Sequence, residues 1–383
     1  MKKLPFPSER LHVLIPVVLG ILITGLLIFL SARIPIAPLH PAGQSQFAKA
    51  TVTKVISNDD SNQSVNTGTP GNQVVELKIT SGPFSGKSCQ AISPNVSNSG
   101  AHCVPGLNVI ARIVPRPDGQ FSATVYNYDR GIFLWVLIGL FFFLLCLTGG
   151  KKGITSSAAL IFTFVCIVFL YIPLMYIGVS PFWAASLAAA VITCMTMFLI
   201  GGWSSKTVCS IVGTLAGILA AGLTAQLFGT LAHISGLNVS EFEVLAYIGM
   251  YSKLNVSEVL FSGILISSLG AVMDISMSVA SVVSEIHSTA PELSAKELFQ
   301  SGMRVGRDMM GTMSATLILA YAGGSINTLI IIYAYSMPYL QYINGYDIGI
   351  NILSGISGAI GVILTVPFVS AVSAFIMTRR EKR

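Results

Sequence analysis

The stretch VLFSGILISSLGAVMDISMSVASVV, residues 259–283, is a run of apolar and small side chains that contains one charged residue, Asp274. A helix rises about 1.5 Å per residue, so this run is long enough to cross the roughly 30 Å hydrocarbon core of a bilayer. The whole chain has the same character, because 53% of its 383 residues are hydrophobic and only 10% are charged. Soluble domains carry about a quarter charged residues, so the sequence predicts a protein that lies mostly in lipid.

Seven further apolar runs are long enough to span a membrane, which predicts an α-helical polytopic protein of about eight transmembrane helices. They occupy residues 11–30, 132–147, 154–177, 182–200, 207–231, 309–335 and 348–377. Ser31-Ala32-Arg33 is a poor cleavage site, so we interpret the first run as an uncleaved signal anchor. The predicted parts are a cytoplasmic tail and anchor (1–35), an exported domain (44–128), a seven-helix body (131–378) and a basic tail (379–383).

The basic residues give a formal net charge of +6, but they form short clusters beside apolar runs and no continuous basic face. This pattern argues against nucleic acid as a partner. If eight helices alternate, one side of the membrane receives Lys2, Lys3, Arg10, Lys151, Lys152, Lys206, Lys296, Arg304, Arg307, Arg379, Arg380, Lys382 and Arg383. By the positive-inside rule that side is the cytoplasm, so we expect both termini there.

The segment between the first two spans is polar, and its side chains alternate with a period of two, which is typical of strands. Five strands are predicted at residues 47–56, 74–80, 87–92, 107–114 and 120–126, and a mobile loop at 57–72. Pro115, Pro117, Asp118 and Gly119 suit a hairpin between the last two strands. Five short strands suit a small barrel of the oligonucleotide/oligosaccharide-binding (OB) type. Such a domain either binds a partner or serves as a spacer packed on the membrane part.

Six cysteines are present, and Cys89 and Cys103 lie in the exported domain, where oxidation is feasible. The two thiols either form a disulfide or stay reduced, and the sequence leaves both alternatives open. The other four cysteines lie in or beside predicted spans.

A five-residue repeat, Leu-Asn-Val-Ser-Glu, occurs at residues 237–241 and 254–258. Each copy stands where a helix is expected to begin. Ser240 with Glu243 fits a capping box, and Asn255 or Ser257 can cap the sixth span. We therefore expect a short interfacial or re-entrant helix over residues 241–251.

Small residues line one face of two predicted spans, where they permit close helix contact in lipid. Gly213, Gly217 and Ala221 do so in the fifth span, and Ser354 and Gly358 in the eighth. We expect buried helix contacts at these positions.

The sixth span carries a polar stripe, because its polar residues recur at spacings of seven, four, three and four. They are Ser267, Asp274, Ser278, Ser281 and Glu285. Asp274 follows Glu258 by about 24 Å of helix, which places it in the inner third of the bilayer, where an unpaired carboxylate costs a few kcal/mol. It either bonds a neighbouring Ser or Thr as a structural group, or binds a proton, cation or substrate. Glu285 either joins this path or is a solvated helix end.

A second capping box, Ser294 with Glu297, predicts a helix that begins at Ala295 and continues into the seventh span. One face of this helix carries Arg304, Arg307, Asp308, Gly311, Thr312 and Thr316. Arg304 or Arg307 can neutralise Asp274, Glu285 or Asp308 at an inner vestibule. The alternative is that the two arginines only anchor the helix on the cytoplasmic side.

Sequence signatures of soluble enzymes are missing, including phosphate-binding Gly-rich loops, His-Glu-x-x-His, Cys-x-x-Cys and Gly-x-Ser-x-Gly. The histidines are isolated, so no metal site is predicted. We expect neither an enzyme nor a cofactor.

The chain resembles the YibE/F-like family of bacterial multispanning membrane proteins. The resemblance is carried by GAVMDISMSVAS at 270–281, GRDMMGTM at 306–313 and TLILAYAG at 316–323. It extends to the order of anchor, exported β segment and helical body. It implies a bacterial plasma-membrane protein, often described as a permease of unknown substrate. The family pattern has Asn where this chain has Ala315, which weakens a catalytic role there.

The sequence favours a transporter or permease whose path is lined by the sixth and seventh spans, with Asp274 as the titrating or substrate-pairing group. Its substrate, a small solute or ion, is not encoded in any recognisable motif. The alternative is an envelope assembly or scaffold protein that binds a protein partner through the exported domain. The lipid bilayer is the one partner common to both, and the oligomeric state is open.

The topology is testable with reporter fusions. A reporter enzyme that works only in the cytoplasm should be active when it is fused after Gly302, whereas one that works only after export should be inactive there. The reason is that the basic residues permit no other consistent eight-span threading. Activity of the exported reporter at that position would contradict the topology.

Overall fold

The structure, a computed structural model, describes residues 8–34, 46–58, 72–94, 100–116, 121–239 and 241–380. Several predictions fall outside these residues: the positions of Lys2, Lys3, Lys382 and Arg383, most of the 57–72 loop, the turn at Pro117, Asp118 and Gly119, and the Ser240 cap. The chain divides into two compact units, Ala37–Leu144 and the combination of Met1–Ile36 with Leu145–Arg383.

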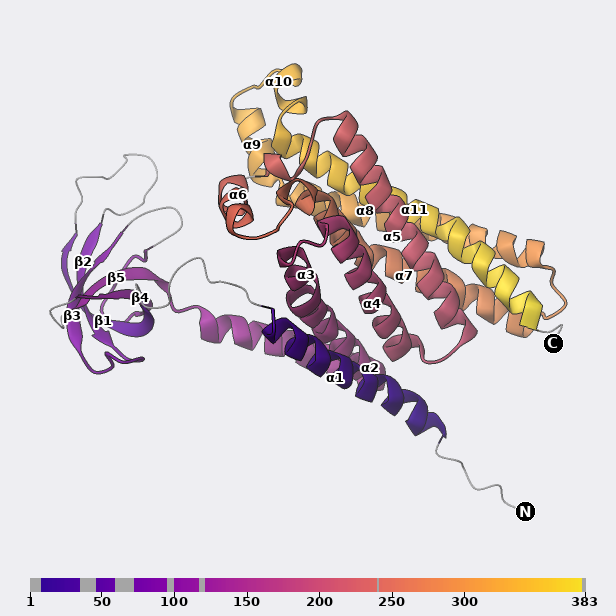
Figure 1. Cartoon of the computed structure of the whole chain (residues 1–383), viewed down its shortest axis with the longest axis horizontal. Helices are drawn as coiled ribbons and strands as arrows, with labels where there is room; N and C mark the ends of the chain where they lie inside the picture. Colours follow the sequence, from indigo (N-terminus) through magenta and orange to yellow (C-terminus); the bar gives the residue numbers. More distant parts are fainter. Residues whose placement is uncertain are drawn as a thin grey trace, which may run out of the picture. The chain divides into compact units, whose positions relative to one another are not determined.

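The first unit contains a closed five-stranded barrel (Figure 1). Its strands are β1 Gln46–Asn58, β2 Gln73–Ile79, β3 Ser88–Ser93, β4 Asn108–Pro115 and β5 Phe121–Tyr128. Around the barrel they follow the order β1-β2-β3-β5-β4, and all neighbours are antiparallel except β3 and β5. The prediction of five strands is confirmed, and each begins and ends within two residues of the expected position.

The barrel core is built from the alternating side chains, among them Val52, Val75, Leu77, Val109 and Val125, each fully buried. This is the pattern of strands with one face on a core and one in water.

Cys103 is buried at the edge of this core and Cys89 is partly buried, and both are free thiols. The Cys103 amide donates to Gln73 Oε1 over 2.6 Å, and Gln73 Nε2 donates to the Cys103 carbonyl over 3.3 Å. Burial raises the pKa of both thiols.

The second unit is helical. Its helices are α1 Ser8–Ala32, α2 Gly131–Cys166 (which enters from the first unit), η2 Ile167–Tyr171, α3 Ile172–Tyr176, α4 Pro181–Gly201, α5 Ser205–Leu231, η3 Gly236–Asn238, α6 Phe242–Tyr251, η4 Val256–Glu258, α7 Val259–Thr289, α8 Ala295–Gly324, α9 Ile326–Ala334, α10 Tyr339–Ile343 and α11 Tyr346–Arg380. α6 matches the predicted short helix. The Ser294–Glu297 capping box is confirmed, since the Glu297 amide donates to Ser294 Oγ and the Ser294 amide to Glu297 Oε2.

Five helical stretches among the described residues are long and apolar enough to cross a membrane, and a sixth if α8 and α9, bent by 61°, form one span. The predicted number of about eight is therefore not confirmed by this count. Two of the predicted runs fall in one stretch, Gly131–Tyr176. The side chains of α1 are described only from Val18. The part that was assessed, Val18–Ala32, is therefore shorter than a span and is not among the five.

The chain reverses direction inside α2, at Gly150, whose backbone is non-helical with φ 53° and ψ −130°. A Cβ placed on Gly153 would lie 2.1 Å from the Leu145 carbonyl oxygen, and the Cys146 and Ser157 side chains are 3.6 Å apart. In a straight helix, residues eight apart are about 12 Å apart along the axis. The residues on either side of Gly150 thus form a tight helical hairpin, for which Gly153 leaves the space.

The core of the helical unit lies where α5, α7 and α11 pack together, with α4 and α8 against them (Figure 1). A Cβ on Gly213 would lie 2.7 Å from Val369, and one on Gly217 only 1.8 Å from Thr365 Oγ1. The Ser276 hydroxyl donates to the Ser210 carbonyl over 2.7 Å, and the Ser210 hydroxyl, which donates to the Lys206 carbonyl over 2.9 Å, also approaches the Ser276 carbonyl at 3.4 Å. Gly358 lies against Leu317 of α8. Small residues and hydroxyl hydrogen bonds are the means by which helices associate in lipid.

Replacing Gly217 with alanine should destabilise the helical unit by about 1–3 kcal/mol, the usual cost of overpacking. Thr365 cannot rotate away freely, because its hydroxyl donates to the Gly361 carbonyl over 2.7 Å. The measurement is the melting temperature in detergent. Gly139→Ala is the matched control, since a Cβ there meets no atom within 4 Å. Equal melting temperatures for the two variants would contradict the contact.

The buried thiols of the barrel should react slowly with iodoacetamide at neutral pH in the native chain and rapidly in urea. A raised pKa keeps the thiol protonated in the folded chain, and a protonated thiol alkylates slowly. The protonated thiols also favour the folded state: this contribution to the free energy of unfolding is present below the unfolded thiol pKa of about 8.5 and is lost as pH rises through the folded pKa. Mass spectrometry of the peptides containing Cys89 and Cys103 measures both rates. A pair that resists alkylation even in urea until reduced would reveal a disulfide instead.

Candidate functional site

The exposed side of α7 carries glycine and polar residues and no large apolar side chain. Every described side chain between residues 252 and 317 that is large and hydrophobic is at least partly buried, whereas Gly263, Ser267, Gly270 and Asp274 are exposed. Helices α5 and α11, in contrast, expose large apolar side chains. α5 exposes Leu223, Leu227 and Phe228, and α11 exposes Ile352, Phe368 and Phe375, as expected for surfaces that contact lipid tails. The α7 surface is therefore not built to contact lipid.

The exposed positions of α7 follow helical spacing, at steps of four, three and four from Gly263 to Asp274, so they lie on one face. The predicted stripe continues along it. Ser278 and Ser281 are half-buried and Glu285 is exposed. The structure thus places all five residues of the predicted stripe on one side of α7.

The adjoining face of α8 continues this surface. Its exposed residues as far as Thr316 are polar or small: Arg304, Arg307, Asp308, Gly311, Thr312, Ala315 and Thr316. Thr312 donates its hydroxyl to the Met309 carbonyl and Thr316 to the Thr312 carbonyl, each over 2.9 Å. Their hydroxyl protons are therefore used within α8, while their oxygen lone pairs remain available as acceptors.

Two contacts fix how α7 and α8 lie beside each other. Near the α7 C-terminus, a Cβ on Gly302 would lie 2.9 Å from Val283. Toward the other end, the hydroxyls of Ser267 and Tyr321 share a hydrogen bond. Between these contacts Asp274 lies level with the region of Thr312. We name the exposed residues of Gly263–Glu285 and Arg304–Thr316 on these two helices the α7–α8 face.

The ion pairs that were one alternative for this face are not formed among the described residues. Among the described residues the one salt bridge joins Lys49 and Asp129 of the barrel unit over 2.9 Å. Arg304 and Arg307 therefore neutralise none of Asp274, Glu285 or Asp308, and Asp274 also has no neighbouring Ser or Thr as a hydrogen-bond partner among the described contacts. The sequence brings these charges to one face, but the fold of a single chain leaves them apart.

Five glycines on α7 and α8 are open, since an added Cβ would meet no atom within 4 Å: Gly263, Gly270, Gly311, Gly323 and Gly324. Gly263 and Tyr321 were not predicted to belong to this site, although Tyr321 lies in the segment at 316–323 that carries the family resemblance. A signal for Gly263 was present, because Gly263, Ser267, Gly270 and Asp274 form a regular pattern of small and polar residues. The Tyr321 contact depends on the crossing of two helices, which no local pattern encodes.

A pocket of about 300 Å³ adjoins the bend between α8 and α9. It is mainly apolar, and its polar lining groups come from Tyr321, Ser325 and Asn351. The Tyr321 side chain lines the pocket and also reaches Ser267, so it connects this pocket with the α7–α8 face.

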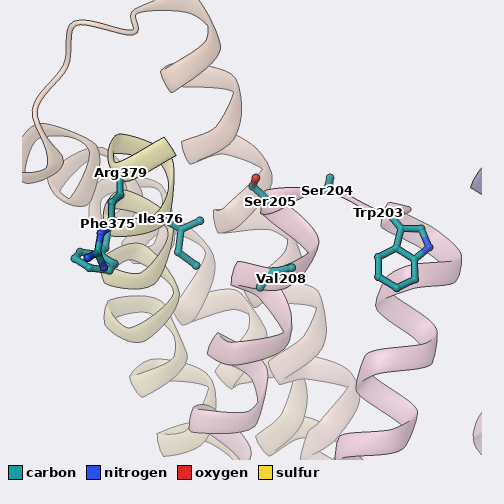
Figure 2. Close-up of a pocket in the computed structure, with 7 residues that line it drawn as sticks. All are labelled: Trp203, Ser204, Ser205, Val208, Phe375, Ile376 and Arg379. Carbon is teal, nitrogen blue, oxygen red and sulfur yellow. The ribbon is translucent and has the colours of Figure 1, made fainter. Parts of the chain in front are cut away.

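A larger hollow of about 710 Å³ lies between the beginning of α5 and the end of α11 (Figure 2). Ser204, Ser205 and Val208 border it from the α5 side, and Phe375, Ile376 and Arg379 from α11, with Trp203 at the α4–α5 turn. These lining residues include none from α7 or α8, so this hollow is separate from the α7–α8 face.

No group of three or more His, Cys, Asp or Glu side chains in the described part of the chain is arranged to hold a metal ion. The chemistry available on the α7–α8 face is that of one deep carboxylate, several hydroxyls and a cluster of charges near the start of α8.

No curated protein and no solved structure matches the chain significantly. The model of one protein family does match, over residues 137–379. That range covers most of the helical body, including α7 and α8, and leaves out the barrel. Since it spans well over half of the sequence, the chain belongs to the YibE/F-like protein family.

Proposed function

We propose that this protein is a membrane transporter or permease in which the α7–α8 face lines the path of a small solute or ion. The observation that carries the proposal is the exposed Asp274 on a face that lacks large apolar side chains. A carboxylate facing hydrocarbon costs several kcal/mol, so ionisable groups at membrane depth normally line water-filled or protein-lined spaces. No enzymatic step belongs to the proposal.

The path would run from the Ser267–Tyr321 hydrogen bond, past Asp274 and the Thr312 and Thr316 oxygens, to the charges around Arg307. Carboxylate and hydroxyl oxygens suit a proton or a hydrated cation, and the arginines suit an anionic group at the inner end. Asp274 would act as the group that binds and releases the transported or coupling ion.

For the topology we propose eight crossings in a bacterial plasma membrane, with both termini in the cytoplasm. The reversal at Gly150 supports this number, because it divides Gly131–Tyr176 into two helices joined beside Lys151 and Lys152. Counting α1 and the bent α8–α9 pair as one span each then gives eight. The basic turn fits the cytoplasmic side.

A second candidate function, envelope assembly through the barrel, is favoured by one observation. Phe47 and Tyr126 are 56% and 47% exposed and touch edge to face at 5.0 Å on the outside of the barrel. Exposed aromatic pairs are common anchors for protein partners. The strand order and the parallel β3–β5 pair support a barrel of the OB type.

The decisive variant is Asp274→Asn, which keeps the shape of the side chain but cannot release a proton or offset a cation. We expect it to abolish flux into proteoliposomes per folded molecule while leaving the melting curve unchanged. Proton flux is followed with a pH-sensitive dye inside the vesicles. Solutes for the same assay are chosen from metabolites that accumulate in a deletion strain.

Asp347→Asn is the matched control, because it makes the same chemical change at an exposed position at the beginning of α11. It should retain flux. Asp274→Ala should behave like Asp274→Asn if the carboxylate acts by its charge. Full flux in the Asn variant, with loss of folding in the Ala variant, would show a structural role for Asp274 and would refute its part in transport.

A further inference from the structure

The α7–α8 face is left uncovered by the other described helices of the helical unit. The other helices present leucine and phenylalanine to lipid, whereas this face presents glycines and a carboxylate. A carboxylate that contacts hydrocarbon costs several kcal/mol, so this face is not a lipid-facing surface. A path needs walls on every side, and the described helices of the helical unit close only one side of this face. Something must cover it at membrane depth.

The charges on this face indicate what kind of surface packs against it. Interpolating between the Gly302–Val283 and Ser267–Tyr321 contacts, Arg304 and Arg307 lie level with Ser281 and Ser278 of α7. They therefore lie, in depth, between the two acids of α7: Arg304 is about one turn of helix from Glu285, and Arg307 about one turn from Asp274. None of these four charged groups forms a salt bridge with another described residue. At similar depths, α7 thus presents two acids and no base, whereas α8 presents two arginines beside one acid, Asp308.

A two-fold axis along the membrane normal preserves depth, so it would bring α7 of one copy against α8 of the other with opposite charges at matching levels. Such isologous, self-complementary interfaces are the commonest form of homo-oligomer. The open glycines at 263, 270 and 311 would allow the backbones to approach closely.

We propose that a second copy of this chain packs on the α7–α8 face, and that the partner's arginines complete the site around Asp274 and Glu285. The path is then enclosed between two copies and does not exist in one. This inference builds on the transport function, but the two can fail separately.

The interface is tested by measuring particle mass after extraction of the native membrane into polymer nanodiscs. The wild-type chain should be a dimer. Gly270→Trp should lower the dimer fraction at least tenfold, because an indole at an open glycine prevents close approach. Leu223→Trp, at a 58% exposed position on α5, should leave the dimer intact. A monomeric wild type, a particle completed by a different protein, or equal dimer fractions in the two variants would overturn the proposal.

A charge exchange provides a test that does not depend on the folding of Gly270→Trp. Glu285→Arg and Arg304→Glu should each weaken the dimer, and the double variant should restore it, because opposite charges meet again across the interface. Failure of the double variant to restore the dimer would contradict the pairing. A dimer without flux would refute transport and leave this interface standing, whereas flux from a monomer would do the reverse.

Discussion

The structure depends on the cost of exposing polar groups to hydrocarbon. In water, exposed positions on a helix tolerate almost any polar side chain, but in lipid each must be apolar or face something other than lipid. α5 and α11 satisfy this condition with leucine, isoleucine and phenylalanine on their outer sides. The exposed side of α7 does not satisfy this condition at Ser267, Asp274 and Glu285, and between them it has only small residues. The asymmetry between these helices divides the helical unit into a lipid-facing part and the α7–α8 face.

Close packing supplies the stability that hydrophobic burial cannot supply inside a membrane. Where α5 meets α7 and α11, glycine lets backbones and hydroxyls come within contact distance, and the Ser276 hydroxyl donates to the Ser210 carbonyl across the gap. Glycines therefore occur in two settings in this chain. Beside the glycines that face α11, atoms of a neighbouring helix occupy the space that a side chain would take. Beside the glycines on the outer side of α7 and α8, that space is open. Glycine thus lies in a packed helix contact in the first setting and on an exposed surface in the second.

Much of this arrangement could be predicted from local sequence. Alternation gave the five strands to within two residues, and Ser294 with Glu297 gave the start of α8. The polar stripe on α7 followed from helical spacing. Two other features could not be predicted, because they depend on contacts between distant segments. Whether the charges near Arg307 pair within the chain stayed open, because local spacing does not say whether a side chain turns toward its neighbour or away. Tyr321 lies in an apolar run, and its importance comes from the crossing of α7 and α8 alone.

Tyr321 joins two regions that would otherwise be independent. Its ring forms part of the wall of the pocket beside the α8–α9 bend, and its hydroxyl is bonded to Ser267 on α7. Any occupant of that pocket that rotates the ring must break this bond and leave the Ser267 hydroxyl with only its hydrogen bond to the Ile264 carbonyl. By thermodynamic reciprocity, whatever engages Ser267 alters affinity for the pocket by the same factor. One phenol group therefore makes the apolar pocket and the polar face parts of a single coupled equilibrium.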